Sequence, residues 1–267
     1  MFKNLNNKKV ILGLVHLIPM PGTPLYEEGN IEKMLEKAIK DCKALKNGGA
    51  DGGLLQSVDV IYPNTDDTDY ARVATLSMIA ARVRDEVGPD FKIGVQLMWN
   101  CITPSLAVAK ATGADFTRCS ALVGSTESAF GKIEANPLKV MEYRNKIHAK
   151  NVAMISEISG YHYKGEYDKQ HIQGLARSSM AVGADAVEIY ASDFEMNERL
   201  VKDVKELGDI AVILGGGTSL DNVKQRLKYA DGALVGSCFE GGKWGGNIIE
   251  SIVADYMKKV RELEKEI

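Results

Sequence analysis

The chain has 267 residues, of which 45% are hydrophobic and 26% charged, and its formal net charge is −3. This composition is ordinary for a water-soluble globular protein, and the lack of a basic excess argues against nucleic acid as a partner. No stretch approaches the roughly 18 uncharged apolar residues of a membrane span, and residues 1–9 lack the apolar region of a signal peptide. The four scattered cysteines, with no CxxC pair, are typical of reduced thiols in a cytoplasmic protein.

In chain order, short apolar runs alternate with amphipathic segments. The run 10–16 is almost continuously apolar, as in a parallel strand buried on both faces, and the segment 32–46 then places apolar residues at helical spacing. The strands predicted in this way are 10–16, 53–57, 92–97, 116–121, 152–158, 186–191, 210–214 and 233–235. The predicted helices are 32–46, 70–87, 103–112, 137–149, 168–182, 195–207, 220–228 and 247–264.

Four predicted helices run out into Ala-Asp directly before an apolar run, at Asp51, Asp115, Asp185 and Asp231. A glycine precedes three of these pairs and supplies the left-handed residue that ends a helix. A recurring helix-stop-strand unit predicts alternating α/β architecture. Eight strands, each followed by a helix, favour a single (β/α)8 TIM barrel over residues 1–267. A doubly wound open sheet is the competing fold, but it usually has fewer strands.

Two glycine-rich segments follow the last two predicted strands, one at 215–217 and the other beginning at Gly236. Glycine lets backbone N–H groups approach an anion closely, and TIM barrels commonly bind phosphate at these two strands. We therefore predict a phosphate site whose donors are the main-chain amides of Gly216, Gly217, Gly236 and Ser237, aided by a helix N-terminus. The alternative is that the glycines only permit tight turns.

Three side chains at the predicted strand ends could exchange protons with a substrate. His16 ends the first strand, and an imidazole titrates near neutral pH, although it could instead hold the proline-rich loop that follows. Glu157 and Glu188 stand in the apolar fifth and sixth strands, where a carboxylate is costly unless it is paired or functional. Glu157 could act as a base or a metal ligand, and Glu188 could instead pair with Arg118 inside the barrel.

Four further residues of the predicted rim are candidates for substrate binding: Asp59, Asn100, Arg118 and His162. Asn100 could bind a sugar hydroxyl, and the guanidinium of Arg118 suits an anionic group. No HxH or HExxH spacing predicts a zinc site, so no metal ligand is assigned, although isolated carboxylates could hold Mg²⁺ together with a substrate. No strand end carries a lysine suited to Schiff-base chemistry.

Five predicted connections are long, at 16–30, 58–69, 123–136, 160–168 and 240–247. Loops of that length in a compact domain are often lids or binding loops, although irregular surface is the plainer interpretation. The chemistry of TIM barrels takes place on the loops that follow the strands, so we expect the site among these segments.

The first long loop carries the most specific pattern of the chain. Residues 13–24, Gly-Leu-Val-His-Leu-Ile-Pro-Met-Pro-Gly-Thr-Pro, resemble the G-x-V-H-L-x-P-x-P-G-x-P hallmark of the BtpA/SgcQ family. Members of that family resemble phosphate-binding TIM barrels, so the resemblance implies the same fold here. It extends over nearly the whole chain, through 48–53, Asn100, 116–118, 131–134, the Gly215 segment, 230–237 and Lys243-Trp244.

The chain departs from the family pattern where polar residues would line the barrel. Gln56-Ser57 stand where relatives tend to carry Glu-Asn, and Gln96 stands where they usually carry Asn. After the fifth strand, the run that begins at Glu157 replaces an Asp-x-His-x-Lys-His run. These differences imply a divergent substrate.

Two functions of different classes remain open. One is an enzyme that acts on a small phosphorylated metabolite, a sugar phosphate or a nucleotide-like compound, by isomerisation, epimerisation or lyase chemistry through His16, Glu157 or Glu188. The alternative is a non-catalytic assembly factor, since one branch of the family is named for photosystem I biogenesis. In either case we expect a homo-oligomer, because barrels of this class often form closed assemblies.

Overall fold

Eight parallel strands close into a barrel in the computed structural model, which describes residues 1–165 and 167–267. The barrel strands are β1 (Val10–Leu17), β2 (Gly52–Ser57), β3 (Lys92–Gln96), β4 (Phe116–Cys119), β7 (Ala153–Ser159), β8 (Ala186–Ile189), β9 (Val212–Leu214) and β10 (Gly232–Val235). Their order around the barrel is β1-β10-β9-β8-β7-β4-β3-β2. The predicted (β/α)8 TIM barrel is therefore confirmed.

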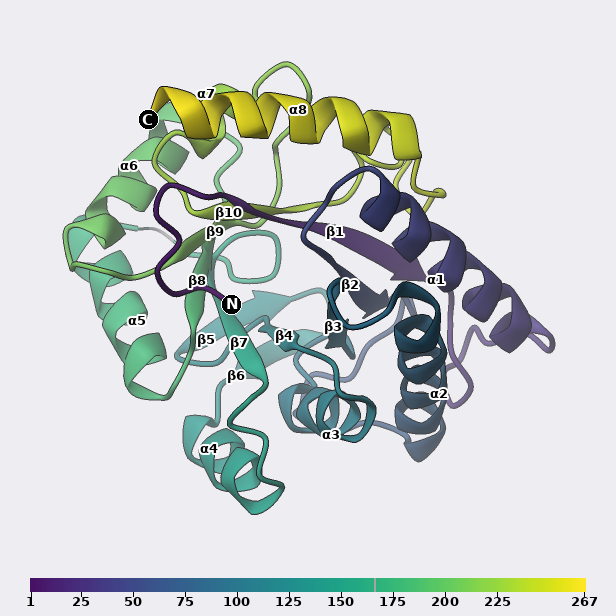
Figure 1. Cartoon of the computed structure of the whole chain (residues 1–267). Coiled ribbons are helices and arrows are strands. Elements are labelled where there is room, and N and C mark those ends of the chain that lie inside the picture. The colour runs from purple at the N-terminus through teal and green to yellow at the C-terminus, as the bar shows by residue number, and fades with distance from the viewer. Residues whose placement is uncertain (166) are drawn as a thin grey trace.

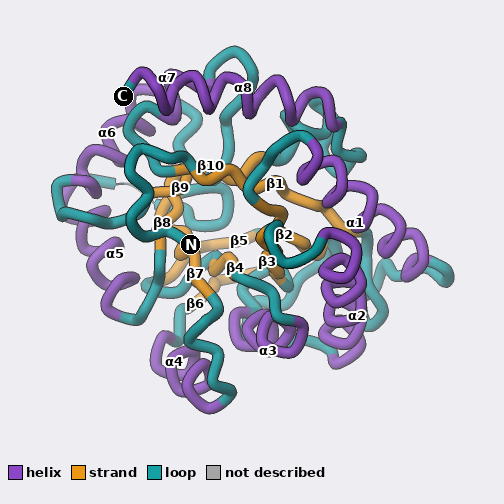
Figure 2. Tube along the Cα trace, in the orientation of Figure 1, coloured by secondary structure: helices purple, strands orange, loops and turns teal. Residues whose placement is uncertain are grey.

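A ring of helices surrounds the strands, as Figures 1 and 2 show. The helices are α1 (Asn30–Asn47), α2 (Tyr70–Val87), α3 (Ile102–Thr112), α4 (Pro137–Lys146), α5 (Lys169–Ala181), α6 (Phe194–Lys205), α7 (Val223–Leu227) and α8 (Glu250–Glu266). They lie within a few residues of the predicted helices. The largest difference in length is at α7, which has five residues where the sequence predicted a helix over 220–228.

The connection after β4 differs from the expected loop. Residues 123–136 contain an antiparallel hairpin of β5 (Ser125–Ser128) and β6 (Gly131–Glu134). Thr126 pairs with Ile133, and both side chains are buried, so one side of each short strand is anchored against the rest of the protein. Phe130 lies in the two-residue turn of this hairpin.

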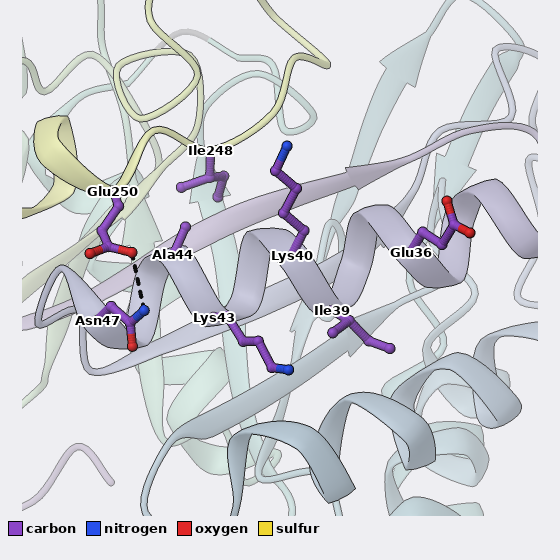
Figure 3. A pocket seen from close by; sticks show the side chains of 8 residues that line it. All are labelled: Glu36, Ile39, Lys40, Lys43, Ala44, Asn47, Ile248 and Glu250. Carbon is purple, nitrogen blue, oxygen red and sulfur yellow. Dashed lines mark hydrogen bonds between the residues drawn. The ribbon is translucent and has the colours of Figure 1, made fainter.

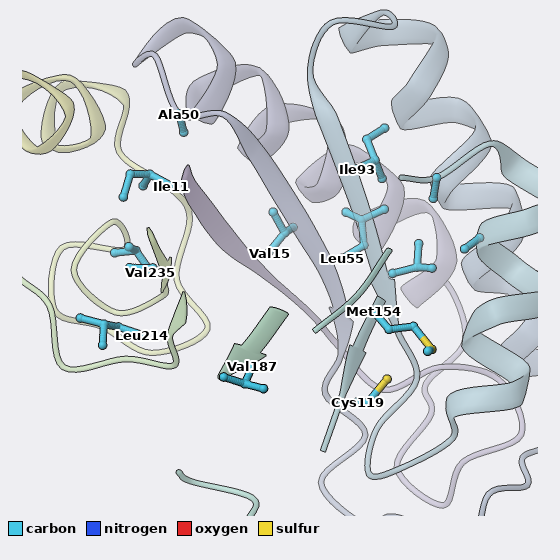
Figure 4. Packing of buried hydrophobic residues seen from close by; sticks show 14 of the residues in the cluster. Ile11, Val15, Ala50, Leu55, Ile93, Cys119, Met154, Val187, Leu214 and Val235 are labelled. Atoms are coloured by element: carbon cyan, nitrogen blue, oxygen red, sulfur yellow. The ribbon is translucent and has the colours of Figure 1, made fainter. Parts of the chain in front are cut away.

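Alternate residues of the barrel strands face two separate apolar cores. Inside the barrel, side chains such as Leu12, Phe116 and Ile213 form one cluster, to which Phe2 of the N-terminal segment belongs. Residues between them in sequence, such as Ile11 and Val187, belong to the larger cluster between the strands and the helices, part of which is drawn in Figure 4. This inner cluster stops short of the C-terminal ends of the strands, where the last inward-facing side chains of most strands are polar.

The four Ala-Asp units share one structural role at the N-terminal end of the barrel. Each aspartate accepts a hydrogen bond from a backbone N–H of the preceding barrel strand: Asp51 from Ile11 at 2.9 Å, Asp115 from Ile93 at 3.0 Å, Asp185 from Met154 at 3.0 Å and Asp231 from Val212 at 2.7 Å. The N–H of each aspartate donates in return to the carbonyl of the same residue. The repeated motif therefore joins the strands two by two at the end away from the long loops.

Three other sequence expectations can be compared with the structure. All four cysteines are free thiols in the part of the chain that the structure describes, and three of them are buried. None of the described helices combines the length and the apolar character needed to cross a membrane. The predicted loop 160–168 includes residue 166, which lies outside the described residues.

Candidate functional site

Six barrel strands carry a polar side chain at their last inward-facing position. On each of these strands the polar residue comes two positions after the last inward-facing residue of the interior below it. The six residues are all buried: His16, Gln56, Gln96, Arg118, Glu157 and Glu188. At the same level, Gly215 follows β9 and Gly236 follows β10. Polar groups are costly to bury, so a whole layer of them at the C-terminal end of a TIM barrel indicates a functional site.

A cavity of about 680 Å³ opens above this polar layer. Its volume is in the range of sites that enclose a small molecule. Three groups of predicted site residues meet around it: His16 from β1, Arg118 and His162, and the phosphate-binding candidates Gly216, Gly217, Gly236 and Ser237.

His16 is held by a glutamate from the far end of the chain. Its Nδ1 lies 2.7 Å from Oε1 of Glu240, and the exposed fractions of the two side chains are 4% and 0%. The second oxygen of Glu240 accepts a hydrogen bond from the N–H of Gly245 at 3.2 Å, and the ring of Trp244 lies 5.2 Å from the imidazole. With Nδ1 bonded to the carboxylate, Nε2 is the nitrogen left to exchange a proton with a ligand.

Glu157 holds His162 in the same manner. The Nδ1 of His162 lies 2.7 Å from Oε2 of Glu157, and the backbone N–H of His162 donates to Oε1 at 2.8 Å. Burial lowers the pKa of His162, although Glu157 opposes the shift, so the imidazole is neutral at neutral pH. Burial alone would raise the pKa of Glu157, but His162 and Arg118 hold that pKa down at about 2.

Arg118 connects Glu157 with Glu188. Its Nε donates to Oε2 of Glu188 at 2.7 Å, while its Nη2 contacts Oε1 of Glu188 and lies 3.1 Å from Oε2 of Glu157. The pairing of Glu188 with Arg118 that the sequence suggests is thus present. One guanidinium cannot neutralise two carboxylates, and burial, together with the charge of Glu157, raises the pKa of Glu188 to about 7.

Neither of these glutamates reaches the cavity. Both side chains are fully buried, and a Cβ at Gly160 would collide with Glu157, as a Cβ at Gly215 would with Glu188. The two glycines therefore cover the carboxylates, whereas Arg118 and His162 line the cavity. Glu157 and Glu188 contact His162 and Arg118, and the catalytic role expected of the two glutamates stays a prediction.

The glycine segments form one wall of the cavity. The φ angles of 152° at Gly216 and 72° at Gly217 are in the region that favours glycine. Among the described residues, none accepts a hydrogen bond from the backbone N–H of Gly216, Gly217 or Ser237. The expected helix N-terminus is not beside them, because α7 begins only at Val223 and a turn follows Ser237. An anion would therefore be bound by the amides themselves.

Two predicted substrate-binding residues are occupied by the protein. Asp59 is fully buried, forms an ion pair with Arg72, and accepts a hydrogen bond from the N–H of Met20 at 3.1 Å. The side-chain amide of Asn100 donates to the carbonyl of Ala121 at 3.0 Å and accepts from its N–H at 2.8 Å. Neither residue lines the cavity. In this structure both side chains hold loops together at the mouth, and their role in substrate binding stays a prediction.

Several residues of the site were not predicted from the sequence. Glu240, which does not itself line the cavity but bonds to His16, follows strand β10 without any local pattern to mark it. Tyr62 and Trp99 line the cavity, in loops whose apolar residues could equally be core. Across residues 1–165 and 167–267, no group of three His, Cys, Asp or Glu side chains is arranged to hold a metal ion.

A second cavity, of about 610 Å³, lies outside the barrel against helix α1. Figure 3 shows Lys40 and Ala44 of α1 on the side of Ile248, near the start of α8, whereas Lys43 points away from it. Asn47 donates to Glu250 at 3.1 Å across this second cavity. It contains none of the predicted site residues, so the cavity at the barrel mouth is the candidate functional site.

The family model of the BtpA family matches residues 7–266. An uncharacterized protein of Thermococcus kodakarensis is 30% identical over 97% of this chain and 97% of its own length. The photosystem I biogenesis protein BtpA of Synechocystis is 26% identical over 94% of this chain and 86% of its own length. Among solved structures, thiamine phosphate pyrophosphorylase from Pyrococcus furiosus matches with a TM-score of 0.56 at 18% identity, covering 97% of this chain and 99% of that one. N-(5′-phosphoribosyl)anthranilate isomerase from the same organism matches with a TM-score of 0.52 at 13% identity, covering 95% and 99%.

Proposed function

This chain belongs to the BtpA family, and on that premise we propose that it is an enzyme acting on a small phosphorylated metabolite, a sugar phosphate or a nucleotide-like compound. One observation carries the proposal. Two histidines, each fixed at Nδ1 by a buried glutamate, line the same cavity as a wall of glycine amides that have no partner among the described residues. Anion-binding donors and proton-transfer groups thus face a single ligand.

The two glutamate–histidine pairs suit acid–base chemistry. A neutral Nε2 accepts a proton from the substrate, and the glutamate at Nδ1 stabilises the imidazolium that forms. The second histidine, protonated at Nε2 as well as at Nδ1, gives up its Nε2 proton. That proton goes to a neighbouring atom in an isomerisation, to the opposite face of the same carbon in an epimerisation, or to the leaving group of a lyase reaction. His16 and His162 are the catalytic residues of this proposal, and Glu240 and Glu157 are their positioning residues.

The similar structures support a phosphorylated ligand only indirectly. Thiamine phosphate pyrophosphorylase and N-(5′-phosphoribosyl)anthranilate isomerase both have phosphorylated compounds in their names, and this chain shares their fold. Mg²⁺ would enter such a site with the substrate rather than on ligands of the protein. A cytoplasmic location and a homo-oligomer remain predictions; exposed apolar side chains on the outer helices, such as Leu138 at 65%, favour association.

The alternative function is a non-catalytic assembly factor. It is favoured by the name of the Synechocystis relative, a photosystem I biogenesis protein. An assembly factor needs the barrel surface but not the histidine pairs, so replacing His16 and His162 would leave that function intact and would abolish an enzymatic one.

The predicted phosphate site is tested by replacing Gly236 with valine. A Cβ at this position would lie 3.2 Å from Cε1 of His16 and 3.3 Å from Cδ1 of Leu14, and the φ of Gly236 lies outside the left-handed region. The substitution therefore crowds the wall without forcing the backbone, unlike Gly217→Val, where φ is 72°. We expect Gly236→Val to lose binding of ribose-5-phosphate and inorganic phosphate in calorimetry.

The matched control is Gly174→Val on α5, where a Cβ would meet nothing within 4 Å. It should bind both probes as the wild-type protein does. Unchanged affinity in a folded Gly236→Val protein would mean that the glycines serve the turns alone, and the phosphate assignment would then be wrong.

A further inference from the structure

An aromatic cluster lies at the mouth of the barrel, built from three loops. Trp99 follows β3, Tyr62 lies in the loop after β2, and Phe130 is at the turn of the β5–β6 hairpin. The ring centroids of Trp99 lie 5.7 Å from Tyr62 and 6.1 Å from Phe130, and His162 approaches Trp99 edge-on at 4.7 Å. All three cluster residues are half-buried, and Tyr62 and Trp99 line the cavity.

Two polar atoms of the cavity wall near this cluster have no partner. Within the described residues, neither the indole Nε1 of Trp99 nor Oε1 of Gln56 forms a hydrogen bond, although both atoms are buried. Gln56 is only 6% exposed, and both residues line the cavity. An unsatisfied buried polar group is unfavourable, so the acceptor of Gln56, a residue of the cavity wall, favours a ligand that brings a hydrogen-bond donor.

The aromatic cluster and the glycines after β9, Gly216 and Gly217, lie on opposite sides of the mouth. In the closed order of strands, β3 is separated from β9 by three strands in either direction. Trp99 follows β3, while Gly216 and Gly217 follow β9, so a ligand whose phosphate binds the glycine amides directs its other end toward Trp99. Aromatic side chains favour flat π-systems in such a position, and stacking of this kind tolerates many ring types.

We propose that the ligand of this cavity is a phosphate ester that carries a planar aromatic or heteroaromatic ring. The ring packs against Trp99 and Tyr62, and a ring N–H or O–H donates to Oε1 of Gln56. This inference rests on the proposed function for the phosphate end and adds the class of compound at the other end.

The first experiment compares phosphate esters with and without a ring. AMP, GMP, CMP and UMP contain ribose-5-phosphate with a base attached, and phenyl phosphate contains a ring on the phosphate alone. We expect at least one of the five to bind about tenfold to a hundredfold more tightly than ribose-5-phosphate in calorimetry, the gain that stacking and a hydrogen bond supply. Trp99→Leu should remove that gain and leave the affinity for ribose-5-phosphate unchanged.

A second measurement avoids altering the cluster. The chain has two tryptophans, so Trp244→Phe leaves Trp99 as the only indole. Titration of this variant with the ring-bearing phosphates should quench its fluorescence to saturation, and ribose-5-phosphate should leave it unchanged. This measurement decides the matter even if Trp99→Leu fails to fold.

The outcomes separate the two proposals. Binding of ribose-5-phosphate or inorganic phosphate, with no ring-bearing phosphate binding more tightly and no quenching, would overturn the ring inference and leave the proposed function standing. Failure of every phosphate compound to bind would overturn both. A ring-dependent gain that persists in a folded Trp99→Leu variant would place the ring elsewhere and would also contradict the inference.

Discussion

The imidazoles of His16 and His162 both bond through Nδ1 to a buried glutamate. For His162, burial lowers the pKa while Glu157 is the main group that raises it. Because Glu157 itself is held ionised by His162 and Arg118, the proton between them belongs to Nδ1 of the histidine. His162 is therefore a neutral base with Nε2 free, whatever the identity of the substrate.

This balance predicts the effect of Glu157→Gln on His162. The wild-type imidazole should titrate below the ordinary histidine value of about 6.5. The variant should titrate lower still, because it loses the charge that stabilises the imidazolium while burial remains. The measurement is an NMR titration of the ring protons, with His162→Gln to assign the resonance. A pKa that rises in the variant would show that Glu157 does not act on this histidine.

At the scale of single residues, the sequence predicted the members of the site better than their roles. His16, Arg118 and Glu157 are recognisable because each is a polar residue at the end of an apolar strand. Their partners are not, since Glu240 is 224 residues from His16 in sequence and nothing local marks it. Asn100 and Asp59 show the limit of such a pattern, because a polar residue near a strand end can equally bond to a neighbouring loop.

At the scale of elements, the barrel was predictable because eight apolar runs alternate with helices, and the hairpin was not. Each of its strands has four residues, and Thr126 and Ile133 are its only buried side chains. So short a pattern cannot be told from an irregular loop. The shortness of α7 has a similar cause, since a helical pattern in sequence does not reveal where the backbone first closes a turn.

The aspartates of the Ala-Asp units stabilise the strands at the opposite end from the cavity. Asp115 accepts the N–H of Ile93, which belongs to a buried residue, and also pairs with Arg84 and Lys92. Asp115→Ala leaves that N–H unpaired, and we expect it to lower the free energy of unfolding by about 1–3 kcal/mol. Denaturant unfolding at neutral pH measures the loss.

The matched control is Asp90→Ala, an exposed aspartate in the turn before β3, which should change stability very little. Asp115→Ala should also leave ligand binding unchanged, because the cavity is at the other end of the barrel. Burial alone would raise the pKa of Asp115, but the Ile93 N–H, Lys92 and Arg84 lower it. The stability that Asp115 contributes is thus present at neutral pH and lost as the pH falls below 3.8. Equal stability of the two variants at neutral pH would contradict the proposed role.

For the molecule as a whole, the two ends of the barrel have opposite effects on stability. The aspartates at the N-terminal end satisfy backbone groups, whereas the polar layer at the C-terminal end buries two carboxylates around one guanidinium. Such an arrangement is costly to desolvate, so we do not expect it to stabilise the fold. The dependence of global stability on pH should reveal that cost.

Glu188 provides the test. Burial and Glu157 raise its pKa from 4.5 to about 7, against the influence of Arg118. A carboxyl whose pKa is raised by folding contributes its full stability below 4.5 and loses it as the pH rises to about 7.

Glu157 acts in the opposite direction, but its pKa of about 2 confines its effect to acid below pH 4.5. His162 opposes Glu188 over part of the pH range in which Glu188 loses stability, because the lowered pKa of His162 adds stability as the pH rises to 6.5. Between about pH 5 and 7 the wild-type protein should therefore lose more free energy of unfolding, or gain less, than Glu188→Gln, because an amide does not ionise. Glu195→Gln, at an exposed position on α6, is the control and should follow the wild type. Denaturant unfolding at several pH values measures all three. Parallel curves for the wild type and Glu188→Gln would show that Arg118 keeps both carboxylates ionised in the native protein.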